Sequence, residues 1–124
     1  MYDICIIGGG PAGLSAALTA NRRNKSCLLI SSAPENSLLY KAEQVDNYLG
    51  LPQISGKELL ELFEAHVRSL GIEIKPGIVT AIMPYGENFG VAVGSDFFEA
   101  KSIIIGIGVS RAKPYPGEDD FLGL

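Results

Sequence analysis

The residues whose type and spacing best suit a chemical role are three glycines near the start of the chain, Gly8, Gly10 and Gly13, in the pattern G-x-G-x-x-G. In this pattern the first glycine allows a tight turn, the second lets a pyrophosphate approach the backbone, and the third lets a helix pack closely on a strand. Pro11 suits the first turn of that helix, because its missing N–H would have no partner there. The remaining N–H groups and the positive end of the helix dipole attract phosphate oxygens. The segment therefore predicts a dinucleotide-binding turn, whereas a glycine turn without a ligand would need only one or two glycines.

The elements around this turn are those that the pattern requires. Residues 2–7 contain an apolar run without alternation, typical of a strand that is covered on both faces of a parallel sheet. Residues 14–23 are rich in alanine and predict a helix. A second apolar run lies within residues 25–31. The order of strand, turn, helix and strand predicts a βαβ unit.

The next part of the chain predicts a long loop followed by a helix. Residues 32–55 are punctuated by proline, asparagine and glycine, which indicates irregular structure. A helix is predicted over 56–70, with Ser55 and Glu58 in the spacing of a capping box. Gly71 stands where a left-handed residue commonly ends a helix.

The remaining pattern predicts a β region. Residues 102–106 form another apolar run, which we interpret as a fully buried strand. Short runs separated by turn residues predict a small antiparallel meander at 72–74, 78–83, 89–93 and 97–99. The predicted fold class is α/β: a Rossmann-like dinucleotide-binding fold, with a parallel sheet, a glycine-rich βαβ unit and a β-meander.

Composition narrows the class of protein and of partner. The chain has 124 residues, of which 47% are apolar, as expected of one globular domain. Its net charge of −4 argues against a nucleic-acid partner and against an anionic membrane surface. No apolar run approaches the roughly 18 residues of a membrane-spanning helix, and no basic segment typical of a signal peptide precedes the first strand.

The two cysteines, Cys5 and Cys27, show no C-x-x-C or metal-ligand spacing. This cysteine usage favours a reducing compartment, and we expect a cytoplasmic protein. The two residues fall on strands that should be neighbours in the sheet, so a redox pair is one interpretation. Small buried apolar side chains are the interpretation we favour.

The end of the second strand leaves the ribose contacts open. An acidic residue about 20 positions after the glycine pattern usually binds the ribose hydroxyls. Here Ser31 and Ser32 take that place, with no carboxylate before Glu35 and no basic residue suited to a 2′-phosphate before Lys41. The two hydroxyls either bind the ribose or begin the loop.

Four segments together resemble the low-molecular-weight thioredoxin reductases, which are pyridine nucleotide-disulfide flavoproteins. Residues 6–17 resemble the start of their FAD-binding domain. Residues 45–50 are similar to V-E-N-(aromatic)-P-G, residues 54–59 to I-S-G-x-E-L, and residues 116–121 to P-G-E-x-x-F. Their order and spacing agree along the whole chain.

The resemblance implies FAD as the cofactor and assigns residues to its parts. Ser31 and Ser32 would lie at the adenosine ribose, and Val79 beside the adenine. Asn47 would contact the flavin half. Gly106 and Gly108, in the segment usually written A-T-G, would lie near the cofactor. The residues implied to hold the pyrophosphate are Gly8, Gly10, Pro11, Ala12 and Gly13.

Departures from the family pattern concern the flavin. The family's G-G-Q-L, which lies over the flavin, is replaced by Asn36-Ser37-Leu38-Leu39, and A-T-G by Gly106-Ile107-Gly108. These changes indicate an atypical branch. The resemblance also implies that residues 1–112 are the first segment of an FAD-binding domain. Residues 113–124 would be a linker toward an NADPH and disulfide domain that this sequence does not include.

The implied activity of the full enzyme is electron transfer from NADPH or another reduced donor through FAD to a disulfide. A thioredoxin-like protein would be the substrate, and the enzyme would be a homodimer. We expect the 124 residues by themselves to be inactive. The alternatives are a stand-alone nucleotide-binding module and a purely structural interaction domain.

Overall fold

A six-stranded sheet with the order β3-β2-β1-β6-β5-β4 organises the molecule. The computed structural model describes residues 1–108. The expected linker and the P-G-E-x-x-F segment lie outside the described residues. The strands are β1 (Tyr2–Ile7), β2 (Cys27–Ser31), β3 (Glu73–Pro76), β4 (Val79–Tyr85), β5 (Asn88–Val93) and β6 (Asp96–Ile105). The helices are α1 (Pro11–Arg22), η1 (Pro34–Asn36), α2 (Leu38–Lys41) and α3 (Gly56–Ser69).

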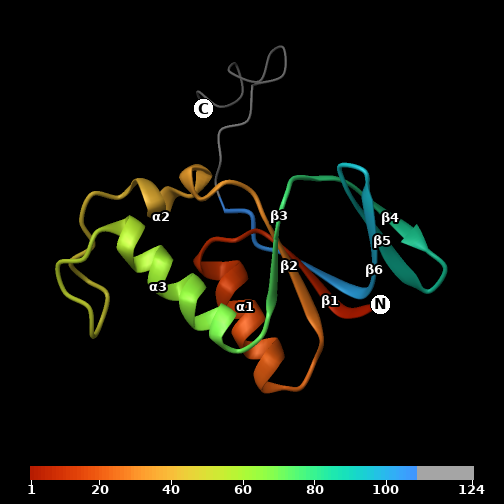
Figure 1. The fold of residues 1–124 in the computed structure, drawn as a ribbon, viewed down its shortest axis with the longest axis horizontal. Coiled ribbons are helices and arrows are strands. Elements are labelled where there is room, and N and C mark those ends of the chain that lie inside the picture. The colour runs from red at the N-terminus through yellow and green to blue at the C-terminus, as the bar shows by residue number, and fades with distance from the viewer. Residues whose placement is uncertain (109–124) are drawn as a thin grey trace, which may run out of the picture.

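The molecule has three layers, which explains why β1 and β2 are apolar without alternation. Successive residues of these strands point to opposite faces of the sheet, and both faces are covered. On one face, Ile6 and Leu29 pack with Leu14 of α1 and Leu60 of α3. On the other face, Cys5, Ile7, Leu28 and Ile30 pack with Val91, Val93 and Ala100 of the antiparallel strands. Figure 1 shows α1 and α3 on one side of the parallel strands and β4 and β5 on the other.

The predicted fold class is confirmed, including the parallel sheet and the glycine-rich βαβ unit. β1 pairs in parallel with β2 on one side and with β6 on the other. β4, β5 and β6 form consecutive antiparallel pairs. Gly86 and Gly94, both with positive φ, stand at the two turns between them.

Two details of the predicted meander are wrong. The run at 72–74 belongs to β3, which pairs in parallel with β2 and not with its neighbour in sequence. The run at 97–99 and most of the run at 102–106 are one strand, β6, because Ala100 and Lys101 continue the strand instead of forming a turn. The first part of β6 pairs with β5 and its second part with β1, so this strand passes from one layer to the other.

The prediction that residues 102–106 form a fully buried strand is also wrong. Ile104 is 38% exposed and Ile105 is 62% exposed. The pairing of β6 with β5 ends at Ala100. Beyond that residue, no other strand of residues 1–108 borders the outer edge of β6. Neither core cluster contains Ile104 or Ile105, so the described residues leave this end of the strand uncovered.

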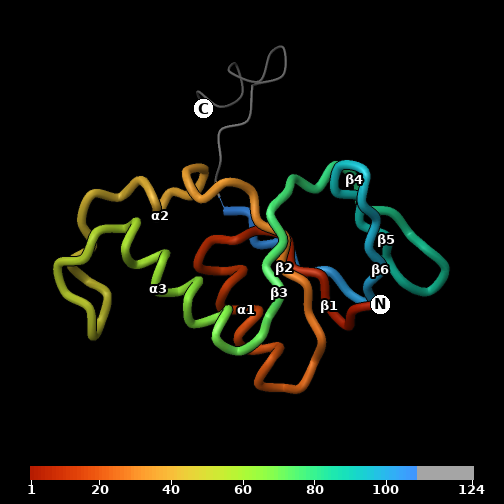
Figure 2. Tube along the Cα trace, viewed as in Figure 1, coloured from red at the N-terminus to blue at the C-terminus, as the bar shows by residue number. Residues whose placement is uncertain are grey.

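The helix predicted over 56–70 is α3, and its first and last residues agree with the prediction to within one residue. The Ser55 side chain accepts a hydrogen bond from the Glu58 backbone N–H at 3.1 Å. Gly71, with φ +78°, follows the end of α3. The loop before it contains η1 and α2, two short helices in a region predicted to be irregular. Residues 42–55 form an outer loop that reaches past the beginning of α3 (Figure 2).

None of the helices in the described part of the chain has the length and apolar character needed to span a bilayer.

Candidate nucleotide-binding site

Gly8 forms the sharp corner at which the chain leaves β1. Its φ is +120°, a conformation that side-chain-bearing residues rarely adopt. A Cβ atom at this position would lie closer than 3.0 Å to the carbonyl of Gly106. The Gly8 N–H donates to the Ile30 carbonyl at 2.9 Å. The turn is therefore fixed between the ends of β1, β2 and β6, and its first residue must be glycine.

Gly10 and Pro11 begin α1. Gly10 occupies the N-cap position with no side-chain cap, and Pro11 follows as the first helical residue. A Cβ atom at Gly10 would meet only the Ser37 Oγ, at 3.8 Å. The first backbone bond of the helix runs from the Leu14 N–H to the Gly10 carbonyl at 3.0 Å. The N–H groups of Ala12 and Gly13 precede this first bond and have no partner within the helix, which is the arrangement that binds a phosphate.

Gly13 and Gly106 bring the helix close to the sheet. A Cβ atom at Gly13 would lie closer than 3.0 Å to the Gly8 carbonyl. One at Gly106 would lie 3.3 Å from the Gly13 nitrogen. The Gly106 N–H donates to the Ile7 carbonyl at 2.8 Å. Gly108 lies two residues further on, with φ +67°, and a Cβ atom there would meet no heavy atom of the described residues within 4 Å.

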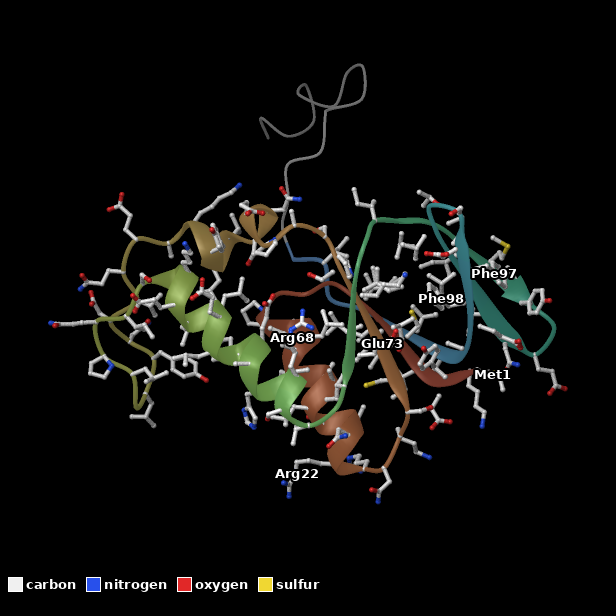
Figure 3. All side chains as sticks on the ribbon, viewed as in Figure 1. Met1, Arg22, Arg68, Glu73, Phe97 and Phe98 are labelled. Atoms are coloured by element: carbon white, nitrogen blue, oxygen red, sulfur yellow. The ribbon has the colours of Figure 1, made fainter. Side chains whose placement is uncertain are left out.

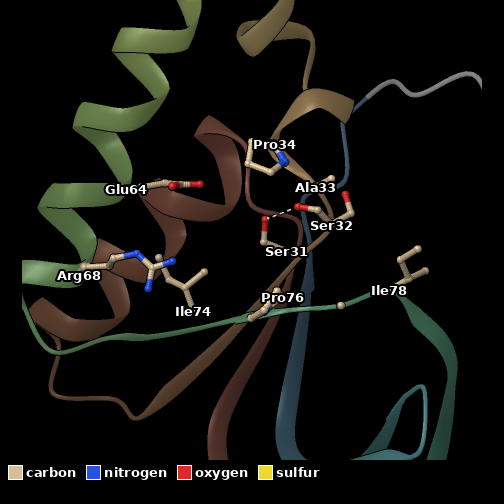
Figure 4. A pocket seen from close by; sticks show the side chains of 10 residues that line it. Ser31, Ser32, Ala33, Pro34, Glu64, Arg68, Ile74, Pro76 and Ile78 are labelled. Atoms are coloured by element: carbon tan, nitrogen blue, oxygen red, sulfur yellow. Dashed lines mark hydrogen bonds between the residues drawn. The ribbon is translucent and has the colours of Figure 1, made fainter.

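Ser31 connects the turn to a neighbouring cavity. A Cβ atom at Gly9 would lie closer than 3.0 Å to the Ser31 Oγ, so the two residues are in contact. The Ser31 hydroxyl donates to the Ser32 carbonyl at 2.9 Å. Both serines line a cavity of about 320 Å³ at the edge of the sheet, together with Pro76, Gly77 and Ile78. Figure 4 shows this cavity above β3, beside α3.

The structure brings together most of the residues assigned to the nucleotide. Close approaches join Gly8 to Gly106, Gly13 to Gly8, and Gly9 to Ser31, and Ser31 and Ser32 line the neighbouring cavity at the carboxyl ends of the parallel strands. Val79 follows Ile78 of the cavity wall, and its side chain packs against the core between the layers. Asn47 lies exposed in the outer loop and lines neither of the two cavities described in residues 1–108. Its predicted contact with the flavin half stays a prediction.

Two residues of this cavity were not predicted from the sequence. Glu64 and Arg68 lie one turn apart on α3, and their side chains project toward the cavity that Ser31 and Ser32 line (Figure 4). Figure 3 shows Arg68 among the other side chains of the molecule. The spacing of four residues places Glu64 and Arg68 on one face of the helix. That signal alone cannot distinguish cavity residues from an ordinary solvated helix face.

The cysteines form no redox pair. Cys5 pairs with Leu28 and faces the antiparallel layer, while Cys27 pairs with Ile4 and faces the helices. Both thiols are free, and they lie on opposite faces of the sheet. Burial raises the pKa of Cys5 to about 11 and also raises the pKa of Cys27. Within residues 1–108 no His, Cys, Asp and Glu side chains gather in a group that could hold a metal ion.

Comparisons with known proteins agree with this geometry. The family model described as pyridine nucleotide-disulphide oxidoreductase matches residues 2–123. The chain is 34% identical over 124 residues to the thioredoxin reductase of Bacillus subtilis (strain 168), covering 99% of this chain and 39% of that protein. A crystal structure of a ferredoxin-flavin thioredoxin reductase from Clostridium acetobutylicum is 46% identical, with a TM-score of 0.83 over 98% of this chain and 42% of that one.

A thioredoxin reductase from Lactococcus lactis is 32% identical, with a TM-score of 0.84, and the match covers 99% of this chain and 41% of that one. The chain therefore spans well under half the length of these three relatives. The matched region contains the whole of the glycine-rich turn, the two serines and the cavity beside them. On its fold and on this match, the chain belongs to the pyridine nucleotide-disulphide oxidoreductase family and resembles the nucleotide-binding part of its thioredoxin reductases.

Proposed function

We propose that this chain is the FAD-binding part of a thioredoxin reductase-like flavoenzyme. The observation that carries the proposal is the start of α1 at Gly10, which has no side-chain cap and where a Cβ atom would meet only the Ser37 Oγ, at 3.8 Å. Gly10 stands at the position where a dinucleotide pyrophosphate approaches the backbone in this fold.

The residues of this chain would bind and orient the cofactor. The outward N–H groups of Ala12 and Gly13 would donate to pyrophosphate oxygens, aided by the dipole of α1. Ser31 and Ser32 would lie at the adenosine ribose, and the backbone near Val79 beside the adenine. Gly106 and Gly108 would lie near the cofactor, and Asn47 would reach its flavin half. When bound, FAD supplies the capacity to accept electrons from a donor and to pass them to a disulfide.

The proposed reaction of the whole enzyme is electron transfer to the disulfide of a thioredoxin-like protein. NADPH is the proposed donor, and its site would lie in a separate domain. Ferredoxin is the second candidate donor, because two structures of a ferredoxin-flavin thioredoxin reductase are 42% and 46% identical to this chain. We further propose a homodimer in the cytoplasm, since the free thiols of Cys5 and Cys27 suit a reducing compartment.

Binding and activity assays of the 124-residue chain test this proposal. We expect it to bind ADP, and to bind FAD weakly, because it holds the pyrophosphate and adenosine residues. We expect no NADPH-dependent reduction of thioredoxin, because the sequence has no C-x-x-C. Calorimetry with ADP and quenching of flavin fluorescence measure the first expectation. Absence of ADP binding by the folded chain would refute the proposal. Robust disulfide reduction would contradict the assignment of that step to a separate domain.

The gene sequence beyond codon 124 distinguishes the enzyme from a stand-alone module. A downstream C-x-x-C with a second G-x-G-x-x-G supports an NADPH-dependent reductase. A C-x-x-C without that second motif supports another donor. A stop codon directly after Leu124 supports a nucleotide-binding module without catalysis.

A further inference from the structure

One side chain that lines the cavity beside Ser31 is a carboxylate, and it belongs to the helix α3 and not to the end of the second strand. Dinucleotide-binding folds commonly place an acidic residue after the second strand, where it binds the ribose hydroxyls. Here that strand ends in Ser31 and Ser32. Glu35, the first carboxylate after them, does not line the cavity. Glu64 of α3 does.

We propose that Glu64 binds the ribose hydroxyls of the adenosine and makes the site selective for an unphosphorylated ribose. This inference rests on the proposed function, because it takes an adenosine dinucleotide as the ligand. In this chain α3 would supply the acidic side chain at the ribose, which the end of β2 lacks.

The position of the cavity follows from its contact with the turn. A pyrophosphate at Gly10 has its adenosine attached on one side, so the ribose must lie within one sugar's length of the turn. Ser31 touches Gly9 and lines the cavity, which joins the two places directly. The wall formed by Ile74, Pro76 and Ile78 is apolar and suits the face of an adenine.

Glu64 is better placed than Arg68 to determine selectivity. They are the only ionisable side chains that line this cavity, and no ion pair joins them in residues 1–108. Glu64 is half-buried, whereas Arg68 is exposed. Solvent and salt weaken the interactions of an exposed charge far more than those of a partly buried one. The carboxylate should therefore attract ribose hydroxyls and repel a 2′-phosphate more strongly than Arg68 attracts that phosphate.

A double cycle, in which the 2′-hydroxyl of the ligand and the charge of Glu64 are removed singly and together, tests the contact between them. We expect the unmodified chain to bind ADP about tenfold more tightly than 2′-deoxy-ADP, a difference of about 1.4 kcal/mol. Hydrogen bonds to a charged group are strong enough to produce this preference. In Glu64→Gln the preference for ADP over 2′-deoxy-ADP should fall to about twofold or less. Removing the ligand hydroxyl and removing the Glu64 charge abolish the same interaction, so the second change adds little to the first. Isothermal calorimetry measures all four affinities.

A second ligand tests selectivity. The unmodified chain should bind 2′-phospho-ADP more weakly than ADP, and Glu64→Gln should narrow that gap. Glu61→Gln is the matched control: it removes the same charge from the same helix, at an exposed position that does not line the cavity. It should leave both preferences unchanged, and circular dichroism melting checks that all three chains are folded.

The outcomes separate this inference from the proposed function. No ADP binding by the unmodified chain would overturn both. ADP binding without a preference over 2′-deoxy-ADP would overturn the role of Glu64 alone, and so would an equal loss of preference in Glu61→Gln. Tighter binding of 2′-phospho-ADP than of ADP would show that Arg68 dominates the cavity and would also overturn it.

Discussion

Gly10 controls the space in front of α1, so a side chain at this position tests the phosphate site without disturbing the core. Its φ of −82° and ψ of −170° are extended backbone that valine adopts readily. We expect Gly10→Val to fold, with a melting temperature close to that of the unmodified chain, and to lose ADP binding because the branched side chain fills the pyrophosphate space. Calorimetry and thermal melting measure the two properties.

Gly13→Val is the contrasting variant. Its side chain would collide with the Gly8 carbonyl, so the variant should lose stability as well as binding. Unchanged ADP affinity in a folded Gly10→Val chain would show that the phosphate binds elsewhere.

Asp3 joins β1 to the residue before β2 and to the middle of β6, and it makes stability depend on acid pH. Its carboxylate accepts a hydrogen bond from the Ser26 N–H at 2.9 Å and lies 3.4 Å from the Lys101 Nζ. The Ser26 backbone, followed by the Ser26 hydroxyl and Lys101, holds the pKa of Asp3 below its ordinary value. A lowered folded-state pKa adds stability that is complete above the unfolded value, about 3.9, and disappears as the pH falls through the folded value.

We therefore expect Asp3→Asn to be less stable than the unmodified chain at pH 7, with the difference shrinking below about pH 4. Urea unfolding between pH 2.5 and 7 measures it. A difference that stays constant across that range would contradict the assigned hydrogen bonds.

At the scale of single residues, the sequence predicted the turn well and the cavity poorly. The turn was predictable because the neighbours of Gly8, Gly10 and Gly13 are close in the chain or fixed by the fold. The spacing of the three glycines therefore indicates the turn directly. Glu64 and Arg68 meet Ser31 only because α3 packs beside the end of β2. No local pattern encodes that meeting, since a helix face with charges four residues apart is common on solvated helices.

At the scale of elements, Ser55 is the residue that starts α3. Its side chain accepts from the Glu58 N–H and satisfies one of the free donors of the first turn. We expect Ser55→Ala to reduce the free energy of unfolding by roughly 0.5–2 kcal/mol. Chemical denaturation followed by circular dichroism measures the change.

Ser69→Ala on the same helix is its control. The Ser69 hydroxyl donates back to the His66 carbonyl at the far end of α3, where no free N–H groups depend on it. Its replacement should change stability by less than about 0.5 kcal/mol. Equal effects of the two substitutions would argue against a capping role for Ser55.

The strands show which element properties a single sequence conveys. Apolar runs without alternation correctly predicted β1 and β2, because both their faces are covered. Pairing partners are a property of the whole sheet, so the parallel pairing of β3 was not predictable from its four residues. Ala100 and Lys101 separate the two runs predicted at 97–99 and 102–106, but they continue β6, and Lys101 is exposed midway along this strand, which serves two layers.

At the scale of the whole molecule, the uncovered end of β6 predicts association. Within the described residues, Ile104, Ile105 and Ile107 are 38%, 62% and 64% exposed, at the end of the strand and just beyond it. Exposed apolar patches of a few hundred Å² commonly mark interaction surfaces. We expect the 124-residue chain to self-associate and to bind a hydrophobic dye, as analytical ultracentrifugation and dye fluorescence would measure.

The double variant Ile105→Glu with Ile107→Glu should reduce both signals. Leu49→Glu is a suitable control, because Leu49 is 98% exposed on the outer loop, outside the patch. If the unmodified chain is monodisperse and does not bind the dye, these isoleucines do not promote association.

The crossing of β6 between layers also determines when the site can form. Tyr2 pairs with Ala100 and Ile7 with Ile105, so the two central strands come from opposite ends of the described chain. Contacts between such distant residues slow folding, because a long loop must close before they form. The βαβ unit and α3 can assemble earlier from nearby segments, but Gly8 meets Gly106 only after β6 has joined β1. The nucleotide cradle is thus completed late, and a bound nucleotide stabilises the finished fold and not its precursors.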